Sequence, residues 1–228
     1  METTVFLVRH AESDYNAENR IQGDCDKAKL TEKGLKQCEA LKEILGKEKF
    51  DVFYSSPLRR AMETARLIKP DGLEIRTDKR LVERDFGELE DKTVDEFKKE
   101  WPGVYELYKK TKRLDGIRGA ESSEHLKKRV WDAFTDIIKK NKGRRILIVT
   151  HGGFIVMVCA VILGVPLEDR SKKIKQKNAN INIIEFDSEN KKYKIIKMNY
   201  TSHLDSRSGG NFPLYPRYNH VGDCYGEG

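Results

Sequence analysis

Short apolar runs alternate with segments of helical periodicity along this chain, and this alternation most constrains its fold. The helical segments cover roughly residues 31–45, 57–68, 126–138 and 154–163, between the runs. Such alternation favours a mostly parallel sheet with helices on both faces. We therefore predict an α/β fold, a three-layer αβα sandwich. The six apolar runs lie at residues 5–8, 51–54, 73–75, 146–150, 181–186 and 193–198.

The C-terminal half adds two further elements and a tail. A polar segment at residues 187–192 separates the last two runs, which predicts a hairpin and an antiparallel edge strand. Residues 93–118 are rich in Lys, Tyr and Glu and are expected to form a helical insert over one end of the sheet. We predict one domain over residues 1–204. Residues 205–228, rich in Ser, Gly, Pro, Asn and Tyr, form a tail that is either flexible or folds over a neighbouring surface.

Two helices have clear start signals. Thr31 is a plausible N-cap, and the helix after it would bury Leu35, Cys38, Leu41 and Leu45 on one face. Pro57 suits the first turn of the next helix. Cys38 and Cys159 fall at apolar positions and are expected to be buried thiols.

Length and composition exclude several classes of protein. The 228 residues suit one α/β domain, and the 36% of charged residues suit a highly charged surface. No run approaches the ~20 apolar residues of a membrane span, and no secretory signal precedes the first run, so we expect a cytoplasmic location. The net charge of +7 favours anionic partners weakly. No stripe of aromatic residues interleaved with basic ones on one face is evident, so nucleic-acid binding is not expected.

Charged residues and histidines stand where the strands end. Arg9 and His10 follow the first run, and His151 follows the run at 146–150 with two glycines behind it. Arg59 lies just past the run at 51–54, at the start of a helix, and Glu83 lies in an irregular segment. The carboxyl ends of parallel strands meet at one crevice, where open α/β sheets bind ligands. Guanidinium groups and a helix N-terminus there suit phosphate oxygens.

Several motifs agree with this arrangement, and together they resemble the histidine phosphatase superfamily, in the branch shared with cofactor-dependent phosphoglycerate mutases. The resemblance spans roughly residues 5–204. The motifs are Arg-His-Ala-Glu-Ser at 9–13, the Asn-to-Gly segment at 16–23, Leu-Thr-x-x-Gly at 30–34, Ser-Pro-Leu-x-Arg-Ala-x-x-Thr-Ala at 56–65, Glu83 with Asp-Phe-Gly at 85–87, Glu-Ser at 121–122, His-Gly-Gly at 151–153 and Asn-x-Thr-x-His-Leu at 199–204.

The resemblance implies a mechanism. His10 would attack the phosphorus and form a phosphohistidine. Arg9, Arg59 and a protonated His151 would surround the phosphate oxygens, so that no metal or other cofactor is required. Glu83 would protonate the leaving oxygen and then take a proton from water.

The same resemblance places further residues at the substrate. Asn16, Gln22, Gly23 and Gly152 match positions that line the pocket in relatives.

Two of these assignments have close rivals in the sequence. Arg60 competes with Arg59, although helix phase and the family spacing favour Arg59. Asp85 and Glu88 lie near Glu83. The remaining histidines, His125, His203 and His220, are interpreted as surface or packing residues.

The chain also departs from the family pattern. Ala11 replaces the usual glycine after the nucleophile, and its methyl group is expected to shift the loop slightly. The segment at 26–31 is longer than usual and adds Lys27 and Lys29 near the rim of the pocket. Gly153 stands where the mutases carry Asn and phosphatases carry Gly. No second Arg pair for a distal carboxylate is evident.

We therefore predict a phosphomonoester hydrolase that acts on a small phosphorylated metabolite through a phosphohistidine. Two alternatives stay open: a cofactor-dependent phosphoglycerate mutase, and a non-catalytic module that binds a phospho-ligand or a protein on the same fold. The expected partner is the small substrate, with neither nucleic acid nor membrane. The sequence leaves a homodimer open.

Overall fold

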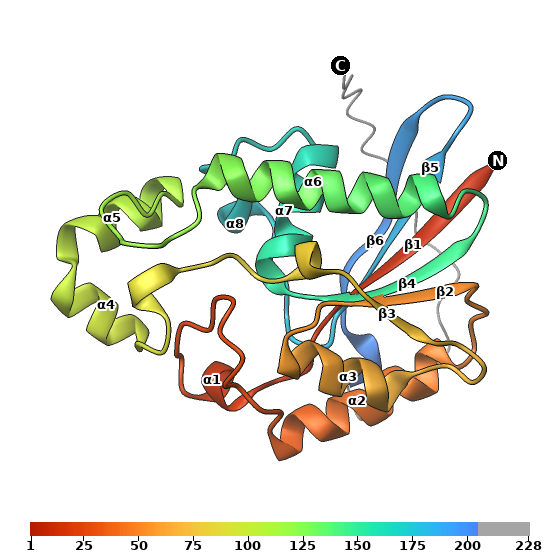
Figure 1. The fold of residues 1–228 in the computed structure, drawn as a ribbon, viewed down its shortest axis with the longest axis horizontal. Coiled ribbons are helices and arrows are strands. Elements are labelled where there is room, and N and C mark those ends of the chain that lie inside the picture. The colour runs from red at the N-terminus through yellow and green to blue at the C-terminus, as the bar shows by residue number, and fades with distance from the viewer. Residues whose placement is uncertain (205–228) are drawn as a thin grey trace.

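The computed structural model describes residues 1–204, and within them a six-stranded sheet is the central layer (Figure 1). The strand order is β3-β2-β4-β1-β5-β6, with β3, β2, β4 and β1 parallel to one another. β5 pairs antiparallel with β1 and with β6, which confirms the predicted hairpin. The strands are β1 (Glu2–Arg9), β2 (Val52–Ser55), β3 (Ile75–Thr77), β4 (Arg145–Thr150), β5 (Ile181–Asp187) and β6 (Lys192–Tyr200).

Helices cover both faces of the sheet, so the predicted three-layer fold class is confirmed. In Figure 1, α6 and α7 lie above the sheet and α2 and α3 lie below it. The helices are α1 (Asp14–Ala17), α2 (Glu32–Leu45), α3 (Arg59–Ile68), α4 (Val94–Glu100), α5 (Pro102–Thr111), α6 (Ser123–Lys140), α7 (Gly152–Ile162) and α8 (Arg170–Lys173), with short 3-10 turns η1 (Lys79–Leu81), η2 (Gly87–Leu89) and η3 (Ser202–Leu204). No helix within residues 1–204 is long and apolar enough to cross a membrane.

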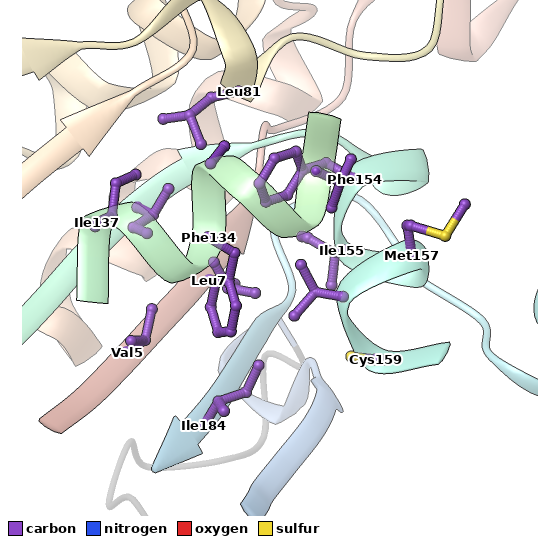
Figure 2. Close-up of a cluster of buried hydrophobic side chains, with 14 of the residues drawn as sticks. Val5, Leu7, Leu81, Phe134, Ile137, Phe154, Ile155, Met157, Cys159 and Ile184 are labelled. Atoms are coloured by element: carbon purple, nitrogen blue, oxygen red, sulfur yellow. The ribbon is translucent and has the colours of Figure 1, made fainter. Parts of the chain in front are cut away.

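The two faces of the sheet take alternate residues of the same strand. On β1, Val5 and Leu7 pack with α6 and α7, and Phe6 and Val8 pack with α2 and α3. This period of two, with apolar residues on both faces, is why the run is continuously hydrophobic. Figure 2 shows the first face, where Leu7 lies against Phe134 of α6 and near Ile155 of α7.

The α2 helix begins as the sequence predicts, with one difference on its buried face. The Thr31 side chain accepts a hydrogen bond from the Gly34 N–H, and Cys38, Leu41 and Leu45 are buried. Leu35 is instead 45% exposed. A Cβ on Gly34 would lie 2.1 Å from the Glu12 carbonyl oxygen, so this helix start fits closely beneath the loop that follows β1.

Register places the ends of β1 and β4 at the same level. Arg9 pairs with Thr150 across these two central strands. The next residue on each strand, His10 and His151, therefore leaves the sheet at the same edge. The predicted insert forms α4 and α5, which lie beyond this edge in Figure 1. The predicted domain boundary, the tail at residues 205–228 and His220 lie outside the described residues.

Candidate active site

Two buried histidines face each other at the ends of the central strands. The rings of His10 and His151 have centroids 5.2 Å apart, and the residues are 2% and 0% exposed. His10 follows β1, and His151 is the N-cap residue of α7. The sequence placed both histidines at one crevice, and the structure brings them together there.

Hydrogen bonding sets the tautomer of His10. Its Nδ1 lies 2.8 Å from the backbone oxygen of Ala11. A carbonyl oxygen only accepts, so Nδ1 carries the proton and Nε2 keeps its lone pair. Burial, and then the positive charges of Arg60 and Arg9, hold the pKa of His10 well below its ordinary value of 6.5. A neutral imidazole with a free Nε2 is the form required of a nucleophile.

The arginine that joins this site from α3 is Arg60, and the placement expected for Arg59 is wrong. Arg60 is 1% exposed and donates to the backbone oxygens of Cys25 and Gly23. The Arg59 side chain is 45% exposed and pairs with Glu63, 2.8 Å away. α3 begins at Arg59 rather than at Pro57. The buried face of α3 carries Arg60, Thr64 and Ile68 at intervals of four residues, and at about 100° per residue Arg59 lies off this face.

Arg9 reaches the same site from the end of β1. Its Nη1 donates to the Gln176 backbone oxygen, 2.6 Å away. Burial lowers the pKa values of both Arg9 and Arg60, yet an arginine keeps its proton at neutral pH. The two guanidinium groups therefore bring fixed positive charge to the buried histidines.

The surroundings of His151 bear on its expected protonation. Burial, followed by the charge of Arg60, holds its pKa well below 6.5, which favours the neutral ring in the absence of a phosphate. Its Nε2 lies 2.7 Å from the Ser56 hydroxyl oxygen. If the hydroxyl donates to Nε2, the proton of the neutral ring sits on Nδ1. His151 would then act on an anion as a neutral hydrogen-bond donor.

Three buried nitrogen atoms of these residues have no hydrogen-bond partner within residues 1–204. They are Nε of Arg9, Nε of Arg60 and Nδ1 of His151. Buried polar atoms are rarely left unsatisfied, because each costs about 1–3 kcal/mol. Three unpartnered nitrogens next to the nucleophile fit a phosphoryl group, whose oxygens accept hydrogen bonds. We call Arg9, His10, Arg60 and His151 the phosphate seat.

Glu83 lies where α7 begins. Its carboxylate accepts hydrogen bonds from the Gly153 N–H at 2.9 Å and from the Arg84 N–H at 2.8 Å. A Cβ on Gly153 would lie 2.1 Å from Oε1 of Glu83. A side chain at residue 153, such as the Asn expected of the mutases, would thus displace Glu83.

Asn16, Gln22 and Gly23 support the seat from its sides. Asn178 donates to the amide oxygen of Asn16 and to the backbone oxygen of His10. Ser13 donates to the Gln22 amide oxygen, and the Gly23 carbonyl accepts from Arg60. These three residues therefore hold the residues around His10.

Gly152 differs from those three residues because it lines a cavity of about 340 Å³, with Arg9 and Glu83 among the other lining residues. A Cβ there would approach the Arg9 guanidinium to 3.3 Å.

The structure places three of the residues that depart from the family pattern, Ala11, Lys27 and Lys29. Ala11 is fully buried, it is absent from the described residues with positive φ, and its N–H donates to the Thr64 hydroxyl. The methyl group of Ala11 therefore fits in the loop after β1 together with this hydrogen bond to Thr64. Lys27 pairs with Asp91 at 3.0 Å rather than facing the seat, and Lys29 is exposed.

The remaining described histidines lie outside the seat. His125 is exposed beside Glu121, and Nε2 of His203 contacts the Ala179 carbonyl. One acidic group within residues 1–204 has a spacing that could hold a metal ion, formed by Asp24, Asp85 and Glu90. Their carboxylate oxygens lie within 4.8 Å of one another.

Two site residues, Ser56 and Arg60, were not among those predicted, although Arg60 was weighed against Arg59. Arg60 had a signal: in the run Ser-Pro-Leu-x-Arg-Ala that begins at Ser56, the arginine of the motif is residue 60. Ser56 is the first residue of the same run, so the motif carried both.

The fold and the seat define an enzyme class that acts on phosphate esters. A comparison with protein families agrees: the model of the histidine phosphatase superfamily (branch 1) matches residues 5–200. The chain belongs to this superfamily, and the predicted enzyme class, a phosphomonoesterase acting through a phosphohistidine, is confirmed.

Individual proteins are similar over most of their length. A metal-independent phosphoserine phosphatase of Arabidopsis thaliana is 36% identical over 211 residues, covering 90% of this chain and 84% of the relative. The structure of Bacillus stearothermophilus YhfR superposes with a TM-score of 0.84 at 29% identity, over 89% of this chain and 100% of YhfR. A mutant phosphoserine phosphatase of Entamoeba histolytica in complex with phosphoserine gives a TM-score of 0.76 at 28% identity, over 89% and 99%.

Proposed function

We propose that this chain hydrolyses a small phosphomonoester by transferring its phosphoryl group to Nε2 of His10. The observation that carries the proposal is the phosphate seat: a neutral histidine whose Nδ1 proton is engaged, together with buried nitrogens of Arg9, Arg60 and His151 that have no hydrogen-bond partner within residues 1–204. These groups would stabilise the charge on the equatorial phosphoryl oxygens.

In the first step, Nε2 of His10 attacks phosphorus while the bond from phosphorus to the ester oxygen breaks. Glu83 in its protonated form gives its proton to the leaving oxygen. The product alcohol departs, and the phosphoryl group stays on His10. The Gly153 and Arg84 N–H groups hold the Glu83 carboxylate in place for this transfer.

In the second step, Glu83 as a carboxylate takes a proton from water, whose oxygen attacks phosphorus. The bond between phosphorus and Nε2 breaks, inorganic phosphate leaves, and His10 returns to its neutral form. Glu83 ends the cycle protonated, as it began. Gly153, the residue that the family resemblance gives to phosphatases rather than mutases, favours hydrolysis over a mutase reaction, and it leaves room for this position of Glu83.

The experiment that tests the proposal compares two histidine variants. His10→Ala is expected to abolish release of phosphate from p-nitrophenyl phosphate and from phosphoserine, the substrate that names two of the similar proteins. His125→Ala, at an exposed histidine, is the matched control and is expected to keep wild-type rates. Near-normal activity of His10→Ala, with the fold verified by circular dichroism, would overturn the mechanism.

We also propose a cytoplasmic location and a small phosphorylated metabolite as partner. Sedimentation of the full chain measures whether it forms the homodimer that the sequence leaves open. A phosphoglycerate mutase would interconvert phosphoglycerates when primed with a bisphosphate, and the proposal predicts phosphate release in that assay instead.

A further inference from the structure

Four basic residues surround the cavity next to Glu83. Arg84 and Arg170 are 3% and 5% exposed, although arginine is rarely so buried. Lys112 and Lys175 line the same cavity. We call these four residues the outer pocket. They come from the segment after η1, the end of α5, α8 and the segment after α8.

No carboxylate within residues 1–204 forms an ion pair with any of the four. Arg84 donates to the backbone oxygens of Glu121 and Lys112. Arg170 donates to the Leu167 carbonyl and the Ser123 hydroxyl. These hydrogen bonds go to neutral acceptors, and the carboxylate of Glu124, which acts on both guanidinium groups, does so from beyond ion-pair distance.

The two lysines have neutral partners as well. Lys175 donates to the Ser171 carbonyl at 2.9 Å, and the Lys112 ammonium lies 4.7 Å from the centre of the Tyr108 ring.

The four charges also oppose one another. Burial, and then Arg84, lowers the pKa of Arg170 to about 10. Burial together with Arg170 and Lys175 lowers the pKa of Lys112. Gathering four basic residues at one cavity is costly, because Glu83 is the one acidic residue among those that line it. A dianionic ligand group there would remove this cost.

We propose that the outer pocket binds a second phosphate group of the substrate. This inference rests on the proposed function, because the first phosphate would occupy the seat, which shares Arg9 with the lining of the same cavity. The substrate class is then a small metabolite with two phosphate groups. A volume of about 340 Å³ suits a ligand of this size.

The lining argues against an ammonium group on the substrate. Glu83 is the acidic residue among the lining residues, and it already accepts the Gly153 and Arg84 N–H groups. An α-ammonium group such as that of phosphoserine would face the cations of the outer pocket instead. We therefore expect phosphoserine to be a weaker substrate than a bisphosphate.

Matched substrate pairs measure this preference. The pairs are fructose 1,6-bisphosphate with fructose 6-phosphate, 2,3-bisphosphoglycerate with 3-phosphoglycerate, and ribose 1,5-bisphosphate with ribose 5-phosphate. In at least one pair kcat/KM for the bisphosphate is expected to exceed that for the monophosphate by about tenfold or more, as a charge-assisted contact implies. Equal values in all three pairs would overturn the inference.

Two lysine variants locate the effect. Lys175→Met is expected to lower the preference for the bisphosphate by about tenfold. The control is Lys172→Met, because Lys172 is exposed on the neighbouring α8, pairs with Asp169 at 3.1 Å and does not line the cavity. This control is expected to leave the preference unchanged. An unchanged preference in Lys175→Met would contradict the assignment of the pocket.

Binding to a variant without turnover separates the two proposals. Titration calorimetry with His10→Ala is expected to show tighter binding of the preferred bisphosphate than of its monophosphate, and Lys175→Met in that background is expected to remove the difference. If His10→Ala binds the bisphosphate and the monophosphate equally well, while turnover by the wild type still depends on His10, the outer pocket is rejected and the proposed function stands. Turnover that persists in His10→Ala would reject the proposed function.

Discussion

The phosphate seat and the outer pocket are both cationic, but they are built in different ways. The seat comes from residues at strand ends and from the first turn of α3, and its nucleophile and its second histidine are almost fully buried. The outer pocket comes from irregular segments, the insert and α8, and its two lysines lie nearer to solvent. The sheet thus fixes the chemistry, while connecting segments decide which molecule reaches it.

The two regions also hold their charges differently. In the seat, buried nitrogens of Arg9, Arg60 and His151 have no hydrogen-bond partner among the residues that the structure describes. In the outer pocket, Arg84 and Arg170 are anchored by carbonyl and hydroxyl groups. Loss of a seat residue should therefore affect every substrate, and loss of an outer-pocket residue should affect some substrates more than others.

The largest expected effect separates the two neighbouring arginines of α3. Arg60→Ala is expected to reduce kcat by about 10³-fold for every phosphomonoester, because it removes a fixed charge at the transferring phosphoryl group. Arg59→Ala removes an exposed ion pair with Glu63, and its kcat is expected to stay within about twofold of the wild-type value. Steady-state assays on p-nitrophenyl phosphate measure both variants.

The reverse order of these two effects would show that the seat is misassigned. The fold of Arg60→Ala is checked by thermal unfolding, since Arg60 also ties the Gly23 and Cys25 carbonyls. Arg60→Lys keeps the positive charge but lacks the planar guanidinium with its several N–H donors, and it is expected to retain more activity than Arg60→Ala.

The next effect concerns Glu83, which touches both regions. Glu83→Gln is expected to reduce kcat by about 10²-fold on esters with poor leaving groups, because the amide cannot transfer a proton. Phenyl esters with better leaving groups are expected to lose less in the first step. A plot of log kcat against the pKa of the leaving group measures this, and an unchanged slope would argue against Glu83 as the acid.

The smallest expected effect is on stability. The pKa of His151 in the folded chain lies below its unfolded value of 6.5, so the unfolded chain binds the proton first. Stability is therefore lost as the pH falls from 6.5 towards the folded pKa. We compare the free energy of unfolding, measured with urea, at about pH 7.5 and pH 5.5. The decrease between these pH values is expected to be about 1 kcal/mol smaller for His151→Asn than for the wild type. Equal losses would mean that the seat does not hold His151 neutral.

The strands and the two histidines were predictable because their signals are local. A run buried on both faces is continuously apolar, and a residue at its end falls at the ligand-binding edge whatever the rest of the chain does. The placement of Arg60 was missed although its signals are local, because Arg60 is the arginine of the Ser-Pro-Leu-x-Arg-Ala motif and shares the buried face of α3 with Thr64 and Ile68. Leu35 was misassigned on α2, where it lies beside the buried face rather than on it.

The outer pocket could not be predicted from the sequence. Lys112 and Arg170 are far apart in the chain, and each lies in a stretch already rich in basic residues. What distinguishes them is a shared cavity without an ion pair to any carboxylate within residues 1–204, which appears only when the insert and α8 are packed against the end of the sheet. Tertiary contacts of this kind carry no local signal.

The central claim, transfer of the phosphoryl group to Nε2 of His10, is tested most directly by trapping the intermediate. The wild-type chain is mixed with a ³²P-labelled phosphomonoester, quenched in alkali, where phosphohistidine survives, and mapped by mass spectrometry with phosphorus-31 NMR to assign the nitrogen. The account predicts an acid-labile phosphoryl group on Nε2 of His10 and none in His10→Ala. Label on another residue, or turnover without any labelled histidine, would contradict it.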